Sequence, residues 1–158
     1  MRRAIMQKPE DLPDDSLAPR ATRQSLPMSL LRAREAMMSH FRPMLDKHGV
    51  NEQQWRVIRV LAEAGQLDAS EVAERANILA PSLTRMIRAM AERGLIKKSR
   101  DAADGRRVML TIAPAGLALL REASPDSARI YTDLESRFGR DNVTALIALL
   151  DALSDLKA

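Results

Sequence analysis

The sequence predicts a mainly α-helical protein that carries one small β-hairpin. Aromatic residues make up only 3% of the 158 residues and there are six glycines, so a sheet-rich fold with many tight turns is disfavoured. The commonest residues, among them Ala, Leu, Arg, Met and Glu, are good helix formers. The apolar residues recur at helical spacing, except between residues 95 and 112, where they alternate. We therefore expect the strands to form a single hairpin between helices.

The amino-terminal region divides into a tail and a first helix. Residues 1–24 are polar and interrupted by prolines, which is typical of a flexible tail. A helix is predicted from about Ser25, with Pro27 in its first turn, and its apolar residues extend to Leu45. Pro43 is expected to kink its last turn.

Two short helices with complete start signals follow. Asn51 with Gln54, and then Asp68 with Glu71, have the spacing of capping boxes, in which each cap side chain bonds the third helical residue. Gly65 is suited to end the first of these helices in a left-handed conformation. The second is expected to end near Ala76.

The next helix begins at Pro81 and has two unlike sides. Leu83, Ile87 and Met90 fall on one side, while Arg85 and Arg88 fall on the other. Gly94 ends the helix, and two strands joined by a polar turn at residues 101–105 follow. Two short helices and a hairpin in this order indicate a winged helix-turn-helix, which we place at residues 51–113.

The positive charge gathers in this region and predicts duplex DNA as a partner. The chain has a net charge of +4, and residues 78–113 alone carry eight basic and three acidic side chains. The first turn of such a helix reaches base edges in the major groove, and an arginine on a hairpin tip suits the minor groove. We expect helix contacts from Ser82, Thr84, Arg85 and Arg88. We expect Arg106 in the minor groove, oriented by Asp104, and phosphate contacts from Lys97, Lys98, Arg100 and Arg107.

The remaining helices are expected to dimerise the protein. A helix is predicted from Pro114, and Ser124-Pro125 should bend or split it. The last helix carries an apolar stripe that includes Val143, Leu146, Ile147, Leu150, Leu153 and Leu156, which is more apolar surface than a monomer leaves exposed to water. We therefore assign residues 25–50 and 114–158 to dimerisation, and we expect a homodimer on a near-palindromic operator.

Enzymatic chemistry finds no support in the sequence. Cysteine is absent, so thiolate metal sites and cysteine nucleophiles are excluded. The only histidines, His40 and His48, have no metal-ligand spacing, and no serine lies in a nucleophile elbow. We expect no metal, no cofactor and no catalysis. Without an apolar run of membrane length or a secretory signal, we expect a cytoplasmic protein that does not contact the membrane.

Several segments resemble the multiple antibiotic resistance regulator (MarR) family. The resemblance spans residues 26–157 and is carried by residues 81–87, 92–96 and 104–108, the last with the motif Asp-x-Arg. Residues 31–43 and 52–56 resemble the subgroup of homoprotocatechuate degradative operon repressors. This resemblance implies an obligate homodimer with intertwined first, fifth and sixth helices. It also implies repression of an aromatic catabolic operon that a phenolic or aryl acid relieves.

The sequence departs from the family where the hairpin meets the next helix, and it leaves the effector open. Ala113, followed by Pro114, stands where the family commonly has a capping threonine. Arg34, His40 and Arg42 are candidates for binding the carboxylate or phenol of an effector, with Trp55 lining its cavity. Alternatively, these polar residues are solvated or lie in an interface, and Trp55 is plain core.

Two other functions fit the same residues. The protein could be a regulator of this type with an unrelated effector or none. It could also be a winged-helix module that binds proteins and not DNA. Loss of operator binding on replacing Arg106 separates DNA binding from the second alternative.

Overall fold

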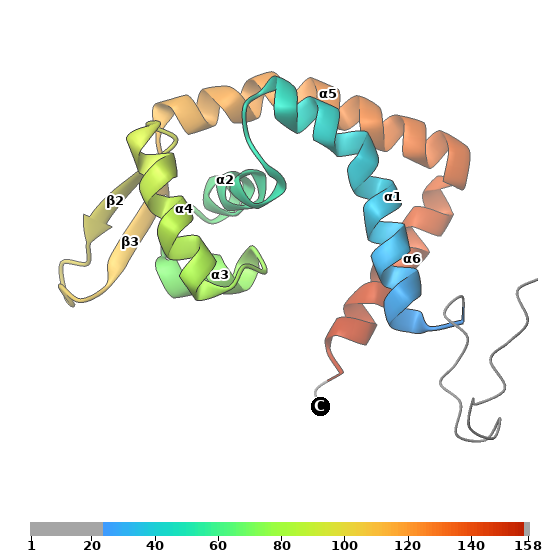
Figure 1. Ribbon diagram of the computed structural model, residues 1–158, viewed down its shortest axis with the longest axis horizontal. Coiled ribbons are helices and arrows are strands. Elements are labelled where there is room, and N and C mark those ends of the chain that lie inside the picture. Colours follow the sequence, from blue (N-terminus) through green and yellow to red (C-terminus); the bar gives the residue numbers. More distant parts are fainter. Residues whose placement is uncertain (1–23, 157–158) are drawn as a thin grey trace, which may run out of the picture. The chain divides into compact units, whose positions relative to one another are not determined.

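The computed structural model describes residues 24–156, and within this range the protein is mainly helical (Figure 1). The predicted fold class, helices with a small β-hairpin, is confirmed. The elements follow the chain in the order α1 Leu26–Lys47, α2 Glu52–Ala64, β1 Leu67–Asp68, α3 Ala69–Arg75, α4 Ala80–Glu92, β2 Ile96–Arg100, β3 Val108–Ile112, α5 Pro114–Phe138 and α6 Arg140–Ser154. Apart from Gln24, the predicted tail lies outside the described residues.

The chain divides between Met38 and Ser39 into two units. Of the first unit, residues 24–38 are described, and residues 26–38 form the beginning of α1, where Ser29 N donates to Ser25 O at 2.9 Å. The second unit holds the end of α1 and all later elements, including every residue predicted to bind DNA.

Both predicted capping boxes are present and start α2 and α3. Asn51 Oδ1 accepts from Gln54 N at 2.9 Å, and Gln54 Oε1 accepts from Asn51 N at 3.1 Å. Asp68 and Glu71 make the same reciprocal pair at 2.8 and 3.0 Å. Gly65 ends α2 as predicted, but with a φ of 81° and a ψ of −104°, which is a positive-φ conformation other than the left-handed helical one expected. Local side-chain chemistry therefore sets where both helices begin.

The sheet has one strand more than the predicted hairpin. The two residues of β1 pair antiparallel with β3, so the strand order is β1-β3-β2, and Leu67 lies opposite Leu110. The sequence predicts Asp68 only as the start signal of a helix. Two residues are too short to show the alternation by which a strand is recognised.

The core of the second unit lies where α2, α4 and the sheet meet. It is formed by apolar side chains that are at most 9% exposed, among them Val57, Ile58, Leu61, Leu83, Met86, Ile87, Met90, Ile96 and Leu110. Burying this side of α4 turns its polar side outward, as the helical periodicity predicted.

Of the bend or split expected at Ser124-Pro125, the split does not occur, since one helix, α5, runs through Pro125 from Pro114 to Phe138. Pro125 cannot donate to the carbonyl of Arg121, but both residues are exposed, so water can hydrate that carbonyl. Ser124 Oγ donates to Leu120 O at 2.6 Å and so bonds the preceding turn. Likewise α1 contains Pro43 and continues to Lys47.

The last helix, α6, has no buried residue in the single chain. Leu146, Ile147 and Leu149 are 43%, 53% and 68% exposed. As for membranes, none of the helices within residues 24–156 has the length and apolar character needed to span a bilayer.

Candidate nucleic-acid interface

The exposed side of α4 presents the predicted helix contacts. Pro81, Thr84, Arg85 and Arg88 are exposed and Ser82 is half-buried. Thr84 Oγ1 donates to Ala80 O at 3.1 Å, so its hydroxyl oxygen remains available as an acceptor. Arg88 pairs with Glu92 at 2.9 Å, whereas Arg85 has no ion-pair partner within residues 24–156. Arg85 is therefore the arginine of this helix that is most available to a base edge or a phosphate.

Two arginines from outside α4 fix its position. At its carboxyl end, Arg93 Nη2 donates to Gly49 O at 2.7 Å. Before its amino end, Arg56 Nη1 of α2 donates to Asn77 O at 3.2 Å, and Asn77 takes a φ of 50°. These bonds anchor the helix without using any residue predicted to touch DNA.

The β2–β3 hairpin, which we call the wing, has a tip shaped by two carboxylates. Asp101 Oδ1 accepts from Ala103 N at 2.7 Å and from Asp104 N at 3.3 Å, and these bonds hold the pKa of Asp101 below its ordinary value. Asp104 Oδ1 accepts from Arg106 N at 3.0 Å. We expected Asp104 to orient the guanidinium of Arg106, but it bonds the backbone, because an aspartate readily reaches the N–H two residues on. The Arg106 side chain is exposed at the tip.

Arg107 differs from the other basic residues of the wing. Lys97, Lys98 and Arg100 are exposed on β2, as a phosphate-binding role requires. The Arg107 guanidinium instead binds Asp68 Oδ2 through Nη2 and through Nε, the latter at 3.1 Å. This bond lowers the pKa of Asp68 and raises that of Arg107. The paired carboxylate neutralises the charge that was expected to attract a phosphate.

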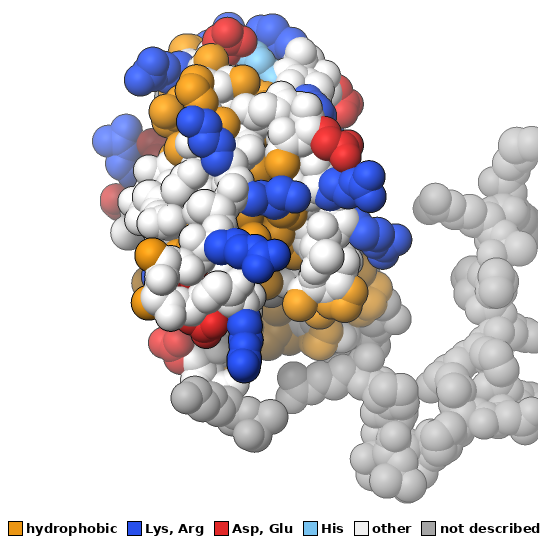
Figure 2. Space-filling model, turned by 90° about the vertical axis from the view of Figure 1, so that its left-hand side faces the viewer, with side chains coloured by type: hydrophobic (Ala, Val, Ile, Leu, Met, Phe, Trp, Pro, Cys, Tyr) orange, Lys and Arg blue, Asp and Glu red, His pale blue; other side chains and the backbone are white. Residues whose placement is uncertain are grey.

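The helix and the wing present their basic side chains on the same part of the molecule. In Figure 1 the amino end of α4 and the turn of the wing both lie toward the lower end of the part of the second unit that holds α2, α3, α4 and the sheet. Figure 2 shows Lys and Arg side chains gathered on the face that carries the wing. In this arrangement α4 and the wing can enter adjacent grooves of duplex DNA.

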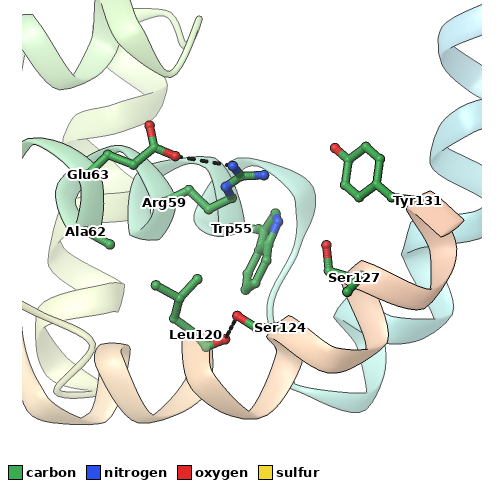
Figure 3. A pocket seen from close by; sticks show the side chains of 9 residues that line it. Trp55, Arg59, Ala62, Glu63, Leu120, Ser124, Ser127 and Tyr131 are labelled. Atoms are coloured by element: carbon green, nitrogen blue, oxygen red, sulfur yellow. Dashed lines mark hydrogen bonds and ion pairs between the residues drawn. The ribbon is translucent and has the colours of Figure 1, made fainter. Parts of the chain in front are cut away.

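A cavity of about 360 Å³ lies between α2 and α5 (Figure 3). It is lined by Trp55, Arg59, Ala62, Glu63, Leu120, Ser124, Ser127, Ala128 and Tyr131. Arg59 Nη2 pairs with Glu63 Oε1 at 3.2 Å, and the Tyr131 ring meets that of Phe41 edge-on at 5.3 Å. An aromatic wall, a cation and several hydroxyl groups make a site that suits a small aryl acid.

Of the four predicted effector residues, Trp55 alone lines this cavity, and it is 8% exposed. Arg42 lines a separate cavity of about 400 Å³ and pairs with Glu52 at 3.0 Å. His40 is exposed on α1 and lines neither cavity, and Arg34 is exposed in the first unit. Sequence reasoning missed Arg59 and Tyr131, although Arg59 follows Trp55 by one helical turn, a spacing that places both on one side of α2.

Comparison with known proteins agrees with this geometry. The MarR family model matches residues 50–108, which span α2 to the start of β3. The homoprotocatechuate degradative operon repressor of Escherichia coli is 38% identical over 127 residues, which cover 80% of this chain and 86% of the repressor.

Two solved structures extend the likeness to three dimensions. The structure of NadR in complex with 4-hydroxyphenylacetate is 35% identical with a TM-score of 0.77, covering 89% of this chain and 100% of NadR. The transcriptional repressor CouR bound to a 23-mer DNA duplex is 27% identical with a TM-score of 0.78, covering 84% of this chain and 94% of CouR. With the identity to the Escherichia coli repressor over most of both chains, the chain belongs to the MarR family, whose members are DNA-binding transcriptional regulators and not enzymes.

Proposed function

We propose that this protein is a homodimeric repressor of an aromatic catabolic operon, released from its operator by a phenolic or aryl acid. The observation that carries the effector part is the cavity between α2 and α5, where Trp55, Arg59 and Tyr131 come together. The names of the relatives support the same function: one represses a homoprotocatechuate operon, and NadR was solved with 4-hydroxyphenylacetate.

On DNA, the first turn of α4 enters the major groove and Arg106 enters the minor groove beside it. Arg85 can bond a guanine edge in bidentate fashion, and Ser82 and Thr84 contact bases or phosphates. The exposed cations of β2, which are Lys97, Lys98 and Arg100, face the phosphate backbone.

A second copy of the chain is needed to form the complete DNA-binding dimer. The exposed leucines and isoleucine of α6 supply the apolar surface for a twofold partner. In such a dimer the two α4 helices lie about 34 Å apart, one turn of DNA, so the operator is a near-palindrome. We place the protein in the cytoplasm. In a bacterium such as Escherichia coli, the source of the related repressor, the DNA lies in the cytoplasm.

The effector lies between the two functional parts of the chain. Its carboxylate pairs with the Arg59 guanidinium in place of Glu63, its ring packs on Trp55, and its phenol bonds the hydroxyl groups of α5. Because α2 belongs to the DNA-binding region and α5 to the dimerisation helices, a bound acid favours one separation of the two α4 helices. DNA affinity then falls by the ratio of the acid's affinities for the two separations.

The test uses a set of matched acids and one pair of variants. A duplex selected by the wild-type protein from a random library serves as operator, and both its release and thermal stabilisation of the protein are followed. We expect 4-hydroxyphenylacetate to act in both assays, phenylacetate to act more weakly for lack of the phenol, and 4-hydroxyphenylethanol to fail for lack of the carboxylate.

Arg59→Gln should still bind the duplex but need at least about tenfold more acid for release, the loss expected for one charge-assisted pair. Arg121→Gln, a change at another exposed arginine, should respond like wild type. If no acid of a wider phenolic and aryl panel stabilises or releases the protein, the effector is unrelated or absent, and the catabolic function is wrong.

A further inference from the structure

Asp68 connects three elements at the base of the wing. It ends β1, caps α3, and lies opposite Met109 of β3 in the sheet. Oδ1 accepts from Glu71 N at 2.8 Å and Oδ2 accepts from the Arg107 guanidinium. The carboxyl side chain is 13% exposed, so both of its oxygens serve fixed partners in a half-buried site.

On the wing, Arg107 is the residue that bonds Asp68. Its carbonyl accepts from Asp101 N at 3.1 Å, and its own N donates to Asp104 O at 3.0 Å, so its backbone closes the turn. The side chain reaches back across the sheet to β1, whereas that of the preceding Arg106 remains exposed at the tip. One residue thus holds the turn by its backbone and ties the turn to α3 by its side chain.

The charge of Arg107 is poorly suited to hold a phosphate. A phosphate would have to replace a carboxylate already bound through two guanidinium nitrogens, which is a strong geometry for arginine. Lys97, Lys98 and Arg100 meet no such competitor, since none has an ion-pair partner in the described part of the chain.

We propose that Arg107 is a positioning residue that fixes the wing against α3 through Asp68, so that Arg106 meets the minor groove when α4 is in the major groove. The inference rests on the proposed DNA contacts of Arg106 and α4. It assigns Arg107 to shaping the protein, and it removes this arginine from the expected phosphate contacts.

The two roles predict opposite signs for Asp68→Asn. Asparagine caps a helix as well as aspartate does, so α3 keeps its start. If Arg107 held a phosphate, losing the competing carboxylate would tighten DNA binding and steepen its dependence on salt. If Arg107 positions the wing, the same change loosens the wing and weakens binding.

The experiment measures affinity for a duplex selected by wild-type protein, by fluorescence anisotropy at several KCl concentrations, and amide hydrogen exchange of the free protein. For Asp68→Asn and Arg107→Gln we expect affinity to fall about tenfold each, roughly threefold for each wing of a dimer, with an unchanged salt slope. The double variant should bind no more weakly than either single variant, because both remove one contact. Amides 101–107 should exchange faster in all three.

Lys98→Gln is the matched control for a phosphate contact. Its salt slope should fall by about 0.9 for each phosphate lost, roughly 2 per dimer, with unchanged exchange in the wing. Tighter binding by Asp68→Asn, or additive losses in the double variant, would overturn the proposal, as would unchanged exchange at 101–107. If wild-type protein selects no duplex, the proposed function fails, while hydrogen exchange still decides whether Asp68 and Arg107 order the wing.

Discussion

At Gly116, in the first turn of α5, the fold has no room for a side chain. An ideal Cβ there would lie 2.2 Å from Leu95 O and 3.0 Å from Ile112 Cγ1. The same Leu95 carbonyl accepts from Ala113 N at 3.0 Å. The backbone that leads into β2 and the beginning of α5 are therefore in direct contact, which fixes the wing relative to the long helix.

Gly116→Ala should destabilise the protein even though alanine is the better helix former. Helix propensity favours alanine by about 1 kcal/mol, but a methyl group that displaces backbone costs about 1–3 kcal/mol beyond that gain. Urea denaturation measures the difference. Gly105→Ala, where no atom lies within 4 Å of the added carbon, should change stability by less than about 0.5 kcal/mol. Equal stability of the two variants would contradict this explanation.

The role of a single residue could be predicted where its hydrogen-bond partner lies within a few positions along the chain. The caps Asn51 and Asp68 were identified because a capping box is complete within four residues. Two features were missed because they join distant parts of the chain. Tyr131 lines the same cavity as Trp55 from 76 positions away, and Arg107 bonds Asp68 from 39 positions away, and no local pattern encodes such pairings.

Among the elements, the end of α1 is tied to the middle of α5 by one carboxylate. Asp126 Oδ2 accepts from Lys47 Nζ at 2.8 Å, and Asp126 also pairs with Arg129 of its own helix. His48 Nε2 lies 3.7 Å from the same oxygen. The bonds from Lys47 and Arg129 lower the pKa of Asp126 to about 2.

This low pKa predicts a contribution to stability that disappears in acid. The carboxyl titrates near 3.8 in the unfolded chain and near 2 in the folded protein, so folding favours the ionised form. The stability lost in Asp126→Asn should be constant above about pH 5 and shrink as the pH falls from about 4 toward 2. Urea denaturation across this range measures it. Asp133→Asn, in an exposed pair with Arg137, should show little loss at any pH, and a larger Asp126→Asn loss at pH 3 than at pH 7 would refute the assignment.

Helices and strands could be predicted where they are long enough for the spacing of their apolar residues to be recognised. The polar and apolar sides of α4 and the wing strands follow directly from spacing. The strand β1 was missed because it has two residues. At Ser124-Pro125, where a bend or a split was expected, the helix is not split, because a proline on the exposed side of a helix costs a hydrogen bond that water can replace.

On the scale of the whole molecule, the described chain leaves one surface apolar and another basic. No residue of α6 is buried, whereas the wing and α4 carry the exposed cations. The sequence predicted both surfaces from composition and period. It could not place the cavity proposed for the effector, since that requires knowing that α2 packs against α5.

The basic surface predicts a steep dependence of DNA binding on salt. Two copies of Lys97, Lys98 and Arg100 in a dimer would engage at least six phosphates, and each releases close to one counterion. Affinity should then fall about 10³-fold between 50 and 200 mM KCl in a gel shift or anisotropy titration.

Arg106→Ala should bind DNA more weakly at every salt concentration, because a guanidinium in the narrow minor groove meets the most negative potential on the duplex. Arg137→Ala, on α5 and paired with Asp133, should leave both affinity and slope unchanged. If Arg106→Ala bound as well as wild type, the wing would not be reading the minor groove, and α4 alone would have to account for recognition.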